Sequence, residues 1–184
     1  MVEAHGNKGY NIFRLLWEKT EVLLTEMDRN EIRDFLMGLL FYKYLSDTVI
    51  CYVGNYFEMP INNLEEIQKT YEENFKNNDV AKVLIADMKK ELSFYIEPDL
   101  TFIYFVKNLN SSNFALIKLL CGLKKIKKSN EFFEIVIKSI ELYNSKVESI
   151  SKRVHEAICD IIRELSTMIV LERDSNFLVM HLNI

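Results

Sequence analysis

The chain has 184 residues, and its 49% hydrophobic and 12% aromatic content is enough to bury one packed core. Five glycines and two prolines are too few for a turn-rich β-sandwich, and runs of Leu, Ile, Lys and Glu favour helices. The formal net charge of -4 excludes a general attraction to nucleic acid, so any DNA contact must come from a local basic patch or a partner subunit. We predict an all-α helical bundle in a single domain over residues 1–184.

Several features predict a cytoplasmic protein. The first nine residues lack the charged and apolar regions of a signal peptide. Cys51, Cys121 and Cys159 are widely spaced within apolar patterns, which favours reduced thiols packed as small core residues. Apolar runs such as residues 35–40 are broken by charge before the ~20 residues that a membrane span needs. We therefore expect no contact with a membrane.

The first predicted helix covers residues 11–25 and has Trp17 at its middle. A short turn at Met27 and Asp28 then reverses the chain, which favours an antiparallel neighbour. Asp28 is a good N-cap residue, and Glu31 follows at the spacing of a capping box. The sequence therefore predicts that the second helix begins here.

This second helix, at about residues 29–57, is predicted to be the central one. Apolar residues recur at three- and four-residue steps along it, interrupted by charge only at Arg33, Asp34, Lys43 and Asp47. We therefore expect a helix that is exposed on a narrow strip and covered by other helices elsewhere. Gly38 disfavours a helix interior by roughly 1 kcal/mol relative to Ala, so its presence predicts the close approach of another helix there.

Pro60 ends the central helix, and three later segments have helical periodicity: residues 64–77, 80–94 and 114–128. The Glu97–Pro98 step marks a further boundary. Two segments are predicted to form short irregular elements: residues 95–110 and residues 130–148. The sequence does not decide between helix and strand in the first of them. The last clear helix opens at Ser149 or Ser151, with apolar residues stepping by three and four.

No arrangement of residues typical of a catalytic site is found. The glycines never fall in the spacing of a phosphate-binding or dinucleotide-binding loop. His155 and Cys159 are four apart, a spacing that can give two metal ligands, but no second ligand pair is visible and a core cysteine is favoured. The carboxylate pairs at residues 65–66 and 72–73 are typical of a solvated helix face. An autonomous enzyme is therefore the least supported hypothesis, with no cofactor expected in this chain.

One basic patch has a functional interpretation. Lysines occupy four of five positions at the end of the predicted helix 114–128: Lys124, Lys125, Lys127 and Lys128. Such a cluster can neutralise DNA phosphates. The simpler interpretation, which we favour, is a solvated helix end stabilised by the helix dipole. Both interpretations stay open from the sequence.

The order of several short segments resembles the N-terminal helical region of the modification (M) subunits of type I restriction-modification systems. The resemblance begins with Leu16–Trp17 and Met27–Asp28 and is densest from Phe35 to Asp47, where the matching residues are Gly38, Leu39, Phe41, Lys43, Tyr44, Ser46 and Asp47. Phe94 to Pro98 and Phe133 to Ser145 are similar to two later segments of that family. The residues carried over as the family-motif core are Trp17, Gly38, Phe41, Lys43, Tyr44 and Asp47.

This resemblance implies a non-catalytic domain of an adenine-specific DNA methyltransferase. Members of the family use S-adenosylmethionine, and two M subunits assemble with a specificity subunit. Their helical N-terminal domain packs on the catalytic domain and helps the M subunits close around DNA. The glycine-rich cofactor loop and the Asn-Pro-Pro-aromatic motif of the catalytic domain do not occur in this sequence, so we expect an excised domain or a natural truncation that does not methylate alone. The alternative is a stand-alone helical protein–protein adaptor unrelated to DNA.

Overall fold

The computed structural model describes residues 20–109 and 151–166. These residues form helices and contain no strand, so the predicted all-α class is confirmed. The 3₁₀ helices are η1 (Leu23–Thr25) and η2 (Pro98–Leu100). The α-helices are α2 (Arg29–Tyr56), α3 (Leu64–Phe75), α4 (Asn78–Leu92), α5 (Phe102–Asn108) and α8 (Lys152–Ser166).

The capping box predicted at Asp28 sets the start of α2. The Asp28 carboxylate accepts hydrogen bonds from the backbone N–H groups of Asn30, at 2.8 Å, and Glu31, at 3.0 Å. The Glu31 carboxylate in return accepts the Asp28 N–H at 2.9 Å. The helix ends at Tyr56, one residue before the predicted end, and Glu58 then takes a positive φ of 53° that turns the chain towards α3.

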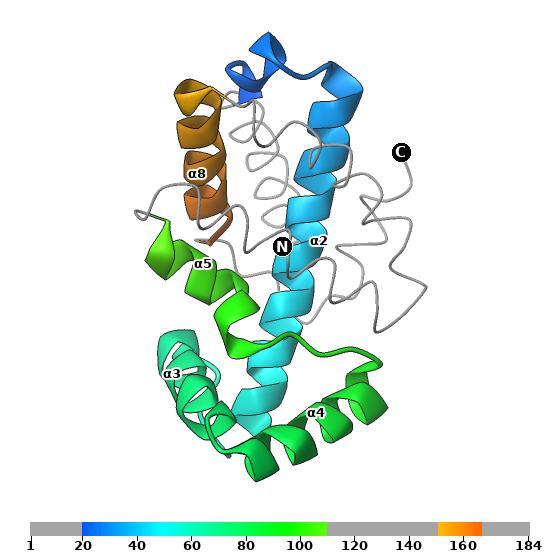
Figure 1. Ribbon diagram of the computed structural model, residues 1–184, viewed down its shortest axis with the longest axis vertical. Coiled ribbons are helices and arrows are strands. Elements are labelled where there is room, and N and C mark those ends of the chain that lie inside the picture. Colours follow the sequence, from blue (N-terminus) through cyan, green and yellow to red (C-terminus); the bar gives the residue numbers. More distant parts are fainter. Residues whose placement is uncertain (1–19, 110–150, 167–184) are drawn as a thin grey trace, which may run out of the picture.

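Helix α2 runs the length of the described fold (Figure 1). Helices α8 and α5 lie along one side of it, and α3 and α4 surround its C-terminal end. The contacts of α2 are made with α3, α5, α8 and η1. This arrangement confirms that the long helix is central, as its apolar periodicity predicts.

The predicted exposed strip of α2 is only partly correct. Arg33 is exposed and Asp34 half-buried, and they pair with each other at 3.0 Å in solvent. Lys43 and Asp47, however, are buried along with the apolar residues of the helix. The error arises because a sequence pattern treats each charge as a contact with water, whereas two opposite charges four residues apart can neutralise each other inside a fold.

Helix α2 is long and apolar enough to cross a membrane by length and composition alone, although the sequence, with its charged residues, predicts no membrane span. In the fold, 67% of the residues in the most apolar window of α2 are buried against the rest of the protein. That burial explains the apolar composition as that of a core helix.

Helices α3 and α4 are capped at their N-termini by Asn63 and Asn77. Asn63 Oδ1 accepts the Glu66 N–H at 3.2 Å, and Asn77 Oδ1 accepts the Asp79 N–H at 3.0 Å. Helix α3 lies close to α2 at Gly54, where an added Cβ would be 2.8 Å from Ile67 Cδ1. Gly38 is buried, and the close approach predicted there stays a prediction.

Two predicted segments differ from the structure. The sequence predicts a single helix over residues 11–25, but only its end, from Thr20, lies within the described residues. There the helix stops after Thr20 and gives way to the 3₁₀ turn η1, because the chain must tighten before it reverses into α2. The segment 95–110 contains η2 and the short helix α5, which resolves the choice between helix and strand. The predicted elements at 114–128 and 130–148 lie outside the described residues.

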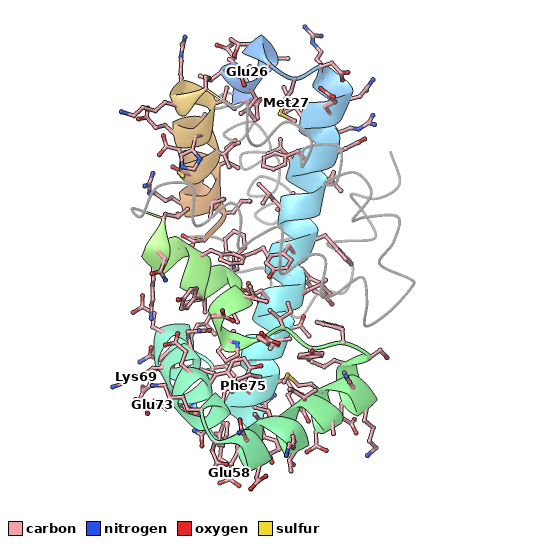
Figure 2. The ribbon with its side chains drawn as sticks, viewed as in Figure 1. Glu26, Met27, Glu58, Lys69, Glu73 and Phe75 are labelled. Atoms are coloured by element: carbon pink, nitrogen blue, oxygen red, sulfur yellow. The ribbon has the colours of Figure 1, made fainter. Side chains whose placement is uncertain are left out.

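Helix α8 confirms the helix predicted after Ser151. The Ser151 hydroxyl oxygen accepts the Val154 N–H at 3.4 Å, and the Ser151 N–H donates to the Glu26 carboxylate at 3.3 Å. Glu26 and Met27 lie at the turn that precedes α2 (Figure 2). The start of α8 is therefore joined to that turn.

Leu39→Ala should lower the free energy of unfolding by about 2 to 5 kcal/mol, because Leu39 is fully buried on α2 and its truncation leaves a cavity. Leu24→Ala is the matched control, since 41% of Leu24 is exposed, and it should change stability by less than about 0.5 kcal/mol. Urea denaturation of the two variants measures the difference. Equal losses would contradict the central position of α2.

Candidate functional site

The segment from Ile96 to Phe102, which we call the strap, is held by buried polar side chains of α2 and α3. The Tyr42 hydroxyl donates a hydrogen bond to the Leu100 carbonyl. Ser46 Oγ accepts the Phe102 N–H at 2.7 Å. Both side chains come from the buried face of α2, one turn apart. Because the strap is largely not regular helix, its buried backbone groups need partners of this kind.

Helix α3 supplies the other side of the network. The Tyr71 hydroxyl donates to the Ile96 carbonyl at 2.7 Å. Gln68 Nε2 donates to the Pro98 carbonyl at 2.8 Å, while Gln68 Oε1 accepts the Thr101 hydroxyl at 2.7 Å. The Gln68 side chain is thereby fixed in one orientation. Its amide recognises both a carbonyl and a hydroxyl of the strap.

An ion pair between Lys43 and Asp47 lies next to this network on α2. The exposed fractions of the two side chains are 4% and 2%. Lys43 Nζ lies 5.6 Å from the centroid of the Phe102 ring, the first residue of α5. The pair therefore faces the junction of the strap and α5.

Burial determines the acid–base properties of these groups. Burial raises the pKa of the Asp47 carboxyl, although the charge of Lys43 and its hydrogen bond act in the opposite direction. Burial also raises the pKa of the Tyr71 phenol well above its ordinary value, and the nearby Glu97 adds to this effect. Both groups therefore favour their protonated forms relative to the unfolded chain. The geometry around Asp47 and Tyr71 suits structural hydrogen bonding.

The network brings together two of the segments that carry the family resemblance. Lys43, Ser46 and Asp47 end the segment 35–47, and the strap begins within the segment 94–98. Of the other motif residues, Gly38 is buried in α2, and Phe41 and Tyr44 pack half-buried against the core. Trp17 and the lysine cluster at residues 124–128 lie outside the described residues.

Sequence reasoning missed Gln68 and Thr101 as members of the site. A signal was present, because Gln68 is polar yet lies on the apolar stripe of α3 between Leu64 and Tyr71. Thr101 follows the Pro98 boundary, and its hydroxyl also caps α5 by accepting the Tyr104 N–H at 3.2 Å. Polar residues at such core positions predict a buried network.

The described residues do not supply the elements of a metal or methyl-donor site. No group of three or more His, Cys, Asp or Glu side chains able to hold a metal occurs in residues 20–109 and 151–166. His155 Nε2 and Cys159 Sγ contact each other at 3.6 Å on α8. A methyl-donor loop needs a strand followed by a glycine-rich turn, whereas the described glycines, Gly38 and Gly54, both lie inside α2.

The fold and this network define an all-α helical domain whose strap is fixed by buried polar side chains. The sequence profile of the HsdM N-terminal domain matches residues 12–165. The chain therefore belongs to the HsdM N-terminal domain family. This confirms the family suggested by the segments around Asp28, Lys43 and Pro98.

A solved structure agrees with this assignment. The crystal structure of the type I restriction-modification system methyltransferase subunit from Streptococcus thermophilus is similar, with a TM-score of 0.75 and 29% sequence identity. The match covers 89% of this chain and 35% of that subunit, so the chain spans about a third of its length. A search among curated proteins finds no match.

Tyr71→Phe should lower stability at neutral pH by about 1 kcal/mol, because it removes the hydroxyl donor to Ile96. The loss should shrink above about pH 10. There the unfolded wild-type chain releases the Tyr71 proton while the folded chain retains it, so the stability of the wild type falls more steeply with rising pH than that of the variant. Urea denaturation at neutral and alkaline pH measures both effects.

Tyr56→Phe is the matched control at neutral pH, since 41% of Tyr56 is exposed. It should change stability by less than about 0.5 kcal/mol. A Tyr71→Phe loss that stays constant from neutral to alkaline pH would contradict the raised pKa of Tyr71.

Proposed function

We propose that this chain is the non-catalytic N-terminal helical domain of an adenine-specific DNA methyltransferase M subunit in a type I restriction-modification system. Its role is to hold the subunits together and to help them close around DNA. The single observation that carries the proposal is the family match over residues 12–165. The similarity to a methyltransferase subunit, of which the match covers 35%, supports it.

In this role the chain serves assembly, and its partners carry out the methyl transfer. The methyl donor S-adenosylmethionine and the target base belong to a catalytic domain, which the proposal treats as the first partner. A second M subunit and a specificity subunit are the other partners. The rigid attachment of the strap to α2 and α3 supports a scaffold role, because docking surfaces need helices that keep fixed positions.

DNA contact is proposed through the lysine cluster at residues 124–128. Changing Lys124, Lys125, Lys127 and Lys128 to Ala should weaken DNA binding by the assembled complex about tenfold or more. The slope of log affinity against log salt should fall by about 0.9 for each lysine that contacts a phosphate. Gel-shift titrations of the co-purified methyltransferase complex at several salt concentrations measure both quantities.

The matched control changes four exposed lysines of the described residues to Ala: Lys69, Lys76, Lys82 and Lys90. It removes the same charge and should leave the salt slope within error of wild type. If the cluster variant keeps the DNA affinity and salt slope of this control, the four lysines do not contact DNA. If the wild-type chain does not co-purify with the catalytic domain and specificity subunit, the scaffold role itself is wrong and the adaptor alternative gains support.

A further inference from the structure

The Lys43–Asp47 pair on α2 is almost completely buried. Both side chains are removed from water, and burial outweighs the attraction of Lys43 in its effect on the Asp47 carboxyl. Asp47 Oδ2 binds Lys43, but Oδ1 is buried and has no hydrogen-bond partner among the residues that the structure describes. A buried ion pair with an unsatisfied oxygen does not fully recover the free energy lost on desolvation.

The apolar contacts of α5 do not by themselves define its position on α2. Phe102 and Phe105 are both buried, and they lie three residues apart on the same face of α5. A shift of α5 by three residues would place one phenylalanine ring where the other now packs and would bring Asp99 or Asn108 to the second position. Hydrophobic contact is non-directional, so it opposes the shifted arrangement only through the polar side chain that would enter the core.

The polar groups of α2 do discriminate between them. Ser46 Oγ accepts the N–H of Phe102, one of the first-turn N–H groups that have no partner within the helix. Lys43 faces the ring of the same residue, and Asp47 binds the Lys43 ammonium group and limits its freedom. These contacts recognise the start of α5. Phe105 cannot replace Phe102 in them, because the Phe105 N–H already donates to the Thr101 carbonyl at 3.1 Å.

We propose that the Lys43–Asp47 pair is a registry lock, which fixes the position of α5 on α2 and does not add net stability. This inference concerns the chain itself and does not rest on the proposed role in DNA methylation. Lys43 and Asp47 act as positioning residues through Phe102. A lone polar residue or pair in an apolar interface is a known device for setting register.

The test uses the full 184-residue chain and two double variants, Lys43→Met with Asp47→Leu and Lys43→Leu with Asp47→Met. Each replaces the pair by apolar side chains. We expect an unchanged or higher urea midpoint for unfolding, together with hydrogen exchange at the Phe102 amide that is faster on the order of tenfold. An unchanged or higher urea midpoint together with weaker protection of the Phe102 amide is the signature of a lock. Removal of a purely stabilising pair would lower both the midpoint and the protection.

The control is the exposed pair Lys69 and Glu73 on α3, which has the same i,i+4 spacing and extends into solvent (Figure 2). Lys69→Met with Glu73→Leu should leave exchange at Phe102 unchanged. Unchanged protection of Phe102 in both Lys43–Asp47 double variants would show that packing alone positions α5, and the proposal would be wrong. Loss of the fold or a lower midpoint in both would also overturn it, because the pair would then be a source of stability.

Discussion

The fold depends on the need to satisfy the backbone of the strap, which crosses the core without forming a continuous helix. Its carbonyl groups at Ile96, Pro98 and Leu100 accept hydrogen bonds from Tyr71, Gln68 and Tyr42. Without these donors, the strap would carry unpaired polar groups into an apolar interior, at about 1 to 3 kcal/mol each. Helices α2 and α3 therefore have to present polar side chains on faces that are otherwise apolar.

This requirement explains which residues the central helix tolerates. Tyr42, Lys43, Ser46 and Asp47 are all buried in α2. Tyr42 and Ser46 bind the strap, Lys43 lies over the Phe102 ring, and Asp47 binds Lys43. An apolar residue at Tyr42 or Ser46 would leave the Leu100 carbonyl or the Phe102 N–H without its partner. Two of the segments that carry the family resemblance, residues 35–47 and 94–98, meet at this network, which gives that part of the resemblance a structural reason.

The sequence predicts the helices well and the site less well. Asp28, Asn63 and Asn77 cap three helices because local side-chain hydrogen bonds depend only on near neighbours in the chain. The burial of Lys43 and Asp47 and the role of Gln68 depend on contacts with residues some thirty to sixty positions away. Helical periodicity contains no information on such contacts. The lysine cluster and Trp17 stay predictions, since they lie outside the described residues.

The central claim is that α3 recognises the strap through Gln68, and a double-mutant cycle between Gln68 and Thr101 tests it most directly. The variants are Gln68→Ala, Thr101→Val and the two together, compared by urea denaturation. Because the Thr101 hydroxyl donates to Gln68 Oε1 at 2.7 Å in a buried site, we predict a coupling energy on the order of 1 kcal/mol. Losses that add within about 0.3 kcal/mol would show that the two side chains act independently, and they would contradict this account of the fold.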